Sequence, residues 1–191
     1  MGVPTARGTA ADKDKAVTKQ TDTLRIAHSA MGCEWEISCW GRSNSYLRAA
    51  CEQAFEAIDS IEEQLSVYRF ASEVSRINHL AAGDDVLVDP VTFALLRRAV
   101  VLSQRTRGAF DITVGPLIKF WAMCKKQNRI PAQEEIAQVL KLIGRDHIQL
   151  DESAKTVRFG REGVEINMGA YGKGCAVDRA ADIMLETDIP G

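Results

Sequence analysis

The chain has 191 residues, of which 46% are hydrophobic and 26% are charged, values typical of an ordinary globular domain. Its 24 basic and 26 acidic side chains give a formal net charge of -2, so no overall positive field favours nucleic acid or an anionic membrane. The five cysteines form no C-x-x-C pair and have no histidines at zinc-finger spacing, which favours reduced, mostly buried thiols.

The first residues contain no apolar stretch long enough for a signal peptide or a membrane span. We therefore expect a disordered tail over residues 1–22, a single domain over residues 23–191, and a cytoplasmic location for this chain.

The first predicted elements are two strands, over residues 24–27 and 34–40, separated by a bend at residues 30–33. In the second strand Trp35, Ile37 and Cys39 alternate with polar residues, which is the two-residue period of a half-buried strand. Residues 45–66 then place apolar side chains at helical spacing, with glutamates on the opposite side. This pattern predicts a long amphipathic helix.

Turn and capping residues delimit the later elements. Asp89 and Pro90 suit the N-cap and first position of a helix that ends near Gly108. The other elements are expected at residues 72–81 (helix), 86–88 (strand), 113 or 115 to 121 (helix), 131–144 (helix), 147–150, 156–159 and 164–167 (strands), and 174–186 (helix). Clustered strands and long helices without regular βαβ alternation predict an α+β fold.

The most informative segment, residues 166–180, is interpreted as a buried strand, a glycine-rich bend carrying Lys173, and a helix. At such a junction the first N–H groups of the helix lack partners and the macrodipole is positive, so a phosphate group would be stabilised there. The glycines follow the order G-x-x-G-x-G, which is neither the dinucleotide fingerprint nor a P-loop. A tight turn that needs glycine only for its backbone angles is the alternative.

Two further positions could serve either structure or binding. Asp111 stands between apolar residues after a helix, where it could cap the next helix or accept hydrogen bonds from the polar edge of a ligand. Tyr68 directly follows the long helix and could pack either in the core or flat against an aromatic ring of a ligand.

Taken together and in this order, these segments resemble the FAD:protein FMN transferase (ApbE-like) family. The resemblance extends from Leu24 to about Thr187. It is carried by Met31-Gly32-Cys33, by L-S-V-Y-R and S-E-V-S-R-I-N within residues 65–78, by G-A-F-D-I-T-V-G-P-L at residues 108–117, and by residues 167–178.

The resemblance implies an ApbE-like mixed sheet with packed helices, and a transferase that performs protein flavinylation. Such an enzyme splits FAD with the help of Mg²⁺ and transfers FMN to a threonine of an acceptor flavoprotein bearing a Ser/Thr-Gly-Ala-Thr-like motif. The backbone carbonyl of Ala170 is implied as a magnesium ligand, and no catalytic residue is assigned. The residues implied to contact FAD are Met31, Tyr68, Ala109, Phe110, Asp111, Asn167 and Lys173.

Two departures from the family pattern affect these expectations. Asn167 occupies a position that is commonly aspartate, and an amide cannot carry the charge that a metal-linked or general-base role would use. The family also continues beyond this point with an acidic residue and a nearby threonine or serine as magnesium ligands, whereas this sequence stops at Gly191. We therefore expect the C-terminal part of the fold to be missing and apolar faces to lie open.

These departures leave alternatives to a transferase: an FAD-binding module without transferase activity, or a non-catalytic subunit that pairs through its exposed surface. Relatives are often exported and lipid-anchored, so a periplasmic or membrane-anchored location is the alternative to the cytoplasm.

Overall fold

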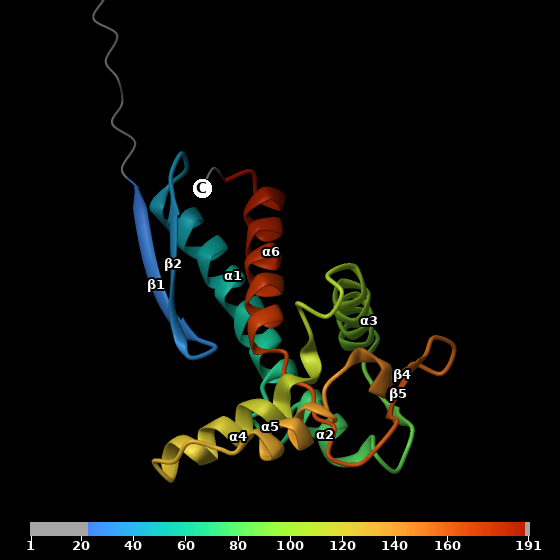
Figure 1. Cartoon of the computed structure of the whole chain (residues 1–191). Helices are drawn as coiled ribbons and strands as arrows, with labels where there is room; N and C mark the ends of the chain where they lie inside the picture. The colour runs from blue at the N-terminus through green and yellow to red at the C-terminus, as the bar shows by residue number, and fades with distance from the viewer. Residues whose placement is uncertain (1–22, 190–191) are drawn as a thin grey trace, which may run out of the picture.

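The computed structural model describes residues 23–189, so the tail predicted for residues 1–22 lies outside the described part. The elements run in the order β1 (Leu24–Ala30), β2 (Cys33–Cys39), α1 (Asn44–Leu65), α2 (Glu73–Leu80), β3 (Val86–Leu87), α3 (Pro90–Arg105), η1 (Ile112–Val114), α4 (Gly115–Lys126), α5 (Gln133–Leu140), η2 (Arg145–His147), β4 (Ile148–Asp151), β5 (Thr156–Phe159) and α6 (Gly169–Glu186). The long helices α1 and α6 lie side by side (Figure 1).

Strands β1 and β2 form an antiparallel hairpin whose last pair is Ala30 with Cys33. The two residues between them, Met31 and Gly32, both have positive φ, at 52° and 70°. Two left-handed residues form the turn whose twist matches that of the flanking strands. The predicted bend is therefore confirmed as a two-residue hairpin turn.

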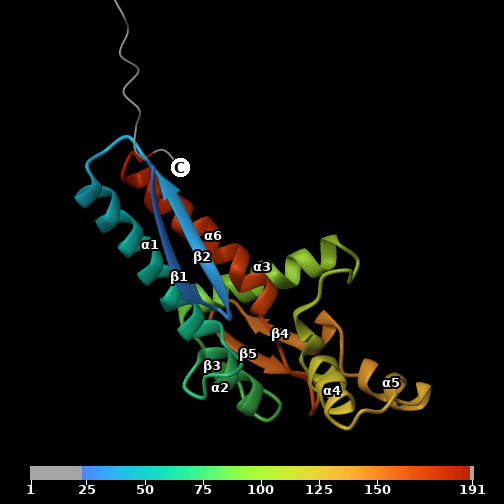
Figure 2. The ribbon, with the colours of Figure 1, turned by 90° about the vertical axis from the view of Figure 1, so that its left-hand side faces the viewer.

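The hairpin covers one side of α1 and α6, as the turned view shows (Figure 2). This part of the molecule has its own core, because the apolar face of α1 packs against the hairpin and α6. The buried members of this hairpin core include Cys39, Leu47, Cys51, Phe55, Ile58, Ala176 and Met184.

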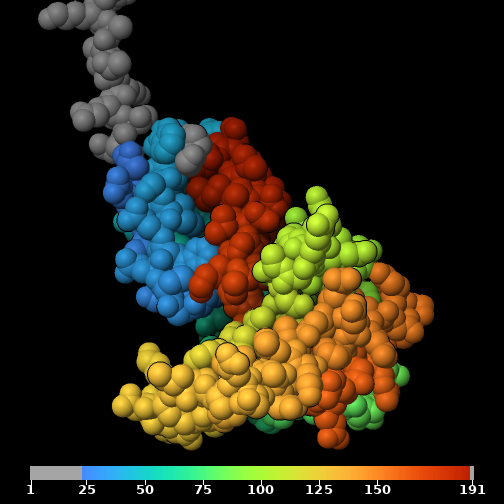
Figure 3. All heavy atoms as spheres, viewed as in Figure 1, coloured from blue at the N-terminus to red at the C-terminus, as the bar shows by residue number. Residues whose placement is uncertain are grey.

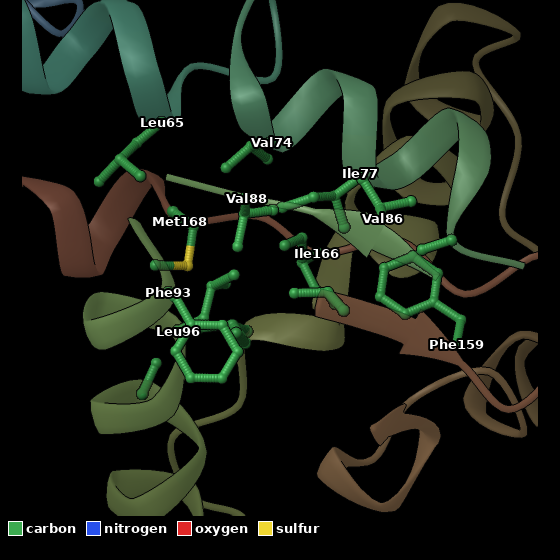
Figure 4. Close-up of a cluster of buried hydrophobic side chains, with 14 of the residues drawn as sticks. Leu65, Val74, Ile77, Val86, Val88, Phe93, Leu96, Phe159, Ile166 and Met168 are labelled. Atoms are coloured by element: carbon green, nitrogen blue, oxygen red, sulfur yellow. The ribbon is translucent and has the colours of Figure 1, made fainter. Parts of the chain in front are cut away.

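The second part contains a three-stranded antiparallel sheet in the order β3-β5-β4. A second set of buried side chains, the sheet core, lies between this sheet, α2 and α3 (Figure 4). Its members include Leu65, Val74, Ile77, Val86, Phe93, Leu96, Phe159, Ile166 and Met168. Helix α3 begins as predicted, since the Asp89 carboxylate accepts hydrogen bonds from Val91 and Thr92 and Pro90 follows the cap.

The segment before α6 differs from the prediction of a strand over residues 164–167. Val164, Ile166 and Met168 are buried as in a strand, but no strand is assigned there. The Asn78 side chain takes the place of a neighbouring strand: it donates to the carbonyl of Ile166 at 2.9 Å and accepts from its N–H at 2.8 Å. The segment is therefore extended and buried without belonging to a sheet.

The start of the last helix also differs from the prediction. Helix α6 begins at Gly169 rather than Gly174, so the glycine-rich segment forms its first turns instead of a bend before it. At Gly172 an added Cβ would lie 3.4 Å from Leu65, so the missing side chain lets α6 approach the end of α1.

The α+β class is confirmed by this mixture of helices and small antiparallel sheets. Among residues 23–189 no helix combines the length and apolar character needed to cross a membrane. Three of the five cysteines, Cys39, Cys51 and Cys124, are buried, as expected. Some large apolar side chains are exposed, among them Val177 and Leu185 on α6.

Candidate functional site

The first candidate cavity lies where the hairpin turn, the end of α1 and the start of α6 meet, and its volume is about 370 Å³. In the space-filling view the surface is recessed between the hairpin and α4 (Figure 3). Four of the residues that the sequence selects, Met31, Tyr68, Asn167 and Lys173, line this cavity. Its remaining walls come from Gly32, Glu62, Leu65, Ser66, Val67, Arg69, Met168, Gly169 and Gly172.

The hairpin turn at the rim of this first cavity is held from two helices. The Met31 N–H donates a hydrogen bond of 2.7 Å to the carboxylate of Glu62 in the last turn of α1. The Lys173 ammonium, in the second turn of α6, donates to the Met31 carbonyl. One peptide unit on each side of Met31 is thereby tied to a charged side chain.

Tyr68 lies on the loop between α1 and α2, and 90% of its surface is exposed. That exposure excludes core packing as the reason for this tyrosine. The loop itself is ordered by hydrogen bonds, since the Ser66 carbonyl accepts from the Ser72 hydroxyl at 2.6 Å and the Ser66 hydroxyl accepts from the Tyr68 N–H at 3.2 Å. The loop thus presents an uncovered aromatic ring at the cavity wall.

The second candidate cavity, of about 570 Å³, lies between the residues after α3, the start of α4 and the start of α6. Ala109, Phe110, Asp111 and Ala170 line it. The carboxylate of Asp111 accepts from the N–H of Thr113 at 2.8 Å and from its hydroxyl at 2.6 Å. Asp111 therefore caps the short helix η1, the structural role left open from the sequence, while also facing the cavity.

Asn167 lines both cavities and stands where they adjoin. Its side-chain oxygen accepts from the Gly169 N–H at 2.9 Å, so one of the N–H groups left unpaired at the start of α6 has a partner. Within that turn the N–H groups of Ala170 and Tyr171 are donors that a helix cannot pair internally. Lys173 lies one turn further along than predicted, so its charge reaches the first cavity from the side of α6.

An aromatic pair forms part of the wall of the second cavity. The rings of Phe110 and Tyr171 have centroids 5.9 Å apart and are tilted by 52°. Burial raises the pKa of Tyr171 to about 12. Its hydroxyl is buried and has no hydrogen-bond partner among the described residues.

The described residues do not fit a complete magnesium site. Mg²⁺ prefers several oxygen ligands in octahedral geometry, normally including carboxylates. Residues 23–189 contain no group of three or more histidine, cysteine, aspartate or glutamate side chains placed to hold a metal ion. The Ala170 carbonyl and the neutral Asn167 amide would be too few ligands on their own.

Sequence reasoning missed Glu62, which lines the first cavity and bonds to Met31. The pattern placed the glutamates of this helix on its solvent side. A usable signal was available, because Glu62 and Glu63 lie in the last turn of a helix, at the negative end of its macrodipole. Carboxylates at that position require a compensating partner.

The fold and the two cavities define an α+β protein with two cavities that share Asn167 at the start of a glycine-rich helix. A sequence model of the ApbE family matches residues 31–191, which is most of the chain. The chain belongs to the ApbE family.

Individual relatives agree with this assignment. The chain is 30% identical over 145 residues to an FAD:protein FMN transferase of Klebsiella pneumoniae, covering 76% of this chain and 46% of the relative. It is 26% identical to the FAD:protein FMN transferase of Haemophilus influenzae, covering 87% of this chain and 50% of that protein. The chain thus spans about half the length of the curated relatives it matches.

Solved structures show the same fold. The crystal structure of the ApbE protein from Thermotoga maritima superposes with a TM-score of 0.79 at 30% identity, covering 87% of this chain and 54% of that one. The flavin transferase ApbE from Vibrio cholerae superposes with a TM-score of 0.76 at 22% identity, covering 88% of this chain and 55% of that one.

Proposed function

We propose that this chain binds FAD and forms the FAD-binding part of an FAD:protein FMN transferase. The observation that carries the proposal is the convergence of the residues that the sequence selects. They come from the hairpin turn, the loop after α1, the residues after α3 and the start of α6, and they line two cavities that adjoin at Asn167.

The chemistry of the two cavities suits a molecule with two aromatic ends joined by a diphosphate. The first cavity offers the exposed ring of Tyr68 and the apolar side chain of Met31. The second offers Phe110 and Tyr171. Lys173 and the first-turn N–H groups of α6 would stabilise negative charge between them.

The activity proposed for the whole protein is transfer of FMN from FAD to a threonine of an acceptor flavoprotein bearing a Ser/Thr-Gly-Ala-Thr-like motif. Magnesium dependence belongs to this proposal, since a metal ion would neutralise the diphosphate when bound. In this proposal the described residues bind FAD: Tyr68 and Phe110 would contact its rings, and Lys173 would orient its phosphates.

The second candidate function is FAD binding without transfer. The observation that favours it is the incomplete set of magnesium ligands among residues 23–189. Incubation with FAD, Mg²⁺ and an acceptor domain, followed by a denaturing gel, separates the two functions. Flavin fluorescence on the acceptor band would support transfer, whereas FAD binding without such a band would support the binding module.

The binding proposal predicts different effects for two neighbouring aromatic residues. Tyr68→Ala should weaken FAD binding about tenfold, because a ring contact of roughly 1.5 kcal/mol is lost. Phe70→Ala is the matched control: Phe70 lies on the same loop and is 87% exposed, but it does not line the first cavity.

Calorimetry with FAD measures both affinities, and the melting temperatures should match the wild type because neither ring is buried. No heat with the wild-type chain would refute the binding proposal. If both variants weakened FAD binding equally, Tyr68 would have no specific contact with FAD.

A further inference from the structure

We infer that Glu62 is a positioning residue for the proposed FAD site: it fixes the hairpin turn over the first cavity and, through the Met31 peptide, the place of Lys173. The expected effect of Glu62 on FAD binding rests on the proposed function. The contacts of Glu62 with the turn do not, because they are present in the protein without ligand.

A carboxylate at the position of Glu62 is destabilising unless other contacts compensate its charge. Glu62 lies in the last turn of α1, where the helix macrodipole is negative and no basic residue of that turn compensates it. It also lines the first cavity, next to the place proposed for the diphosphate of FAD, where another negative charge would repel the ligand. Only 22% of its side chain is exposed.

The contacts of Glu62 offset this cost. One carboxylate oxygen accepts the Met31 N–H at 2.7 Å. The other lies 3.8 Å from the guanidinium of Arg69, which also lies 3.6 Å from Glu63. Glu62 thus joins the hairpin turn to the loop that carries Tyr68, across the end of α1.

The turn needs such a tether because of its backbone conformation. Met31 has a φ of 52°, a left-handed conformation that suits the hairpin turn but is uncommon for a residue with a Cβ, so contacts that hold its peptide groups stabilise the turn. Glu62 holds the N–H of Met31 and Lys173 holds its carbonyl. If Glu62 released the N–H, the turn could move and the carbonyl that locates the Lys173 ammonium would move with it.

Three variants separate the effect of side-chain length at position 62 from the effect of its charge. Glu62→Gln keeps the length and an oxygen acceptor for the Met31 N–H but loses the charge. Glu62→Asp keeps the charge but is one methylene too short to make the same bond. Glu63→Ala is the matched control, because Glu63 shares the Arg69 ion pair but makes no contact with the turn among the described residues.

The first measurement is amide hydrogen exchange at Met31 by NMR, in the protein without FAD. Glu62→Asp should speed exchange about tenfold or more, as expected for the loss of a hydrogen bond to a charged group. Glu62→Gln and Glu63→Ala should stay near the wild-type rate. Unchanged exchange in Glu62→Asp would overturn the inference, and circular dichroism of each variant verifies that it is folded.

The second measurement is FAD affinity by calorimetry. Glu62→Asp should weaken binding about fivefold to tenfold, whereas rescue by glutamine should keep affinity within about twofold of wild type. A general loss of stability would not give this order, since it would not single out the variant that retains the charge. Equal weakening by Glu63→Ala would overturn the positioning role.

The two proposals fail differently. If the wild-type chain binds no FAD, the proposed function is wrong, yet the exchange rates at Met31 still decide whether Glu62 holds the turn. If FAD binds and the exchange rate of Met31 does not depend on Glu62, only the positioning role is wrong.

Discussion

The thiols of Cys39 and Cys51 show how burial governs a single reactive group. Both side chains are fully buried between β2 and α1, with their sulfur atoms 3.6 Å apart. Burial raises the pKa of Cys51 to about 12, and the hydrogen bond with Cys39 is the second, smaller cause. Since the thiolate is the reactive form, this thiol should be inert toward alkylation in the folded protein.

The raised pKa of Cys51 predicts loss of stability in alkali. Below about pH 9 the Cys51 thiol is protonated in both the folded and unfolded states, so its ionisation does not lower the free energy of unfolding there. Between pH 9 and 12 the unfolded chain releases the proton more readily, so the free energy of unfolding falls as pH rises.

Urea unfolding of wild type and Cys51→Ala at pH 8, 9.5 and 10.5 measures this effect. The decline with pH should be shallower in Cys51→Ala, although that variant starts from a lower stability because it leaves a small cavity. Cys33→Ala removes an exposed thiol and should follow the wild-type curve. Parallel curves for wild type and Cys51→Ala would contradict the raised pKa of Cys51.

At the scale of elements, the site depends on how closely α4 approaches the segment that leads into α6. A Cβ added at Gly115, the first residue of α4, would lie 2.8 Å from the carbonyl oxygen of Glu165 and 2.9 Å from its Cβ. Real atoms do not approach so closely, and a backbone carbonyl cannot rotate away as a side chain can. The glycine therefore sets the spacing between α4 and residues 164–168.

Gly115→Ala should therefore lower the free energy of unfolding by about 1–3 kcal/mol, the usual cost of forcing extra volume into a packed site. Gly174→Ala is the matched control, because nothing lies within 4 Å of its added Cβ and alanine favours the helix. That variant should gain up to about 1 kcal/mol. Urea unfolding measures both, and a Gly115→Ala protein as stable as wild type would disprove the close approach.

Elements defined by neighbouring residues were predicted well from the sequence. Asp89 and Pro90 mark the start of α3 because capping is a local interaction. The segment over residues 164–167 was predicted wrongly because its partner, Asn78, is 88 residues away from Ile166 in the chain and acts through a side chain. Alternation of buried residues cannot reveal which group pairs with the backbone.

For the candidate site, the structure shows where the selected residues lie, and their role in binding stays a prediction. The order of the family strings selected residues that line two adjoining cavities, although local patterns alone left Tyr68 and Asp111 open. The position of Lys173 was wrong by a turn, since glycines that suggested a bend are accommodated within α6. Glu62 escaped notice because its partner, Met31, is 31 residues away.

On the scale of the whole molecule, α1 and α6 join the hairpin core to the sheet core. The end of α1 supplies Leu65 to the sheet core, while Phe55 and Ile58 earlier in the helix belong to the hairpin core. Met168, directly before α6, lies in the sheet core, and Ala176 within the helix lies in the hairpin core. Neither core can lose its packing without disturbing a helix that the other core needs.

This sharing predicts that residues 23–189 unfold in one cooperative transition. Leu96 and Leu47 are both fully buried, one in each core. Leu96→Ala and Leu47→Ala should each lower the free energy of unfolding by about 2–5 kcal/mol. In both variants, urea curves from tryptophan fluorescence and from far-ultraviolet circular dichroism should coincide, because both cores unfold together.

Leu185→Ala provides the control for these substitutions, because Leu185 is 75% exposed on α6. Its effect should stay within about 0.5 kcal/mol. Two separate transitions, with only one of them shifted by Leu96→Ala, would show that the cores unfold independently. In that case the cavity between them could open without global unfolding, and the proposed binding site would form only when the hairpin part and the sheet part are both folded and docked.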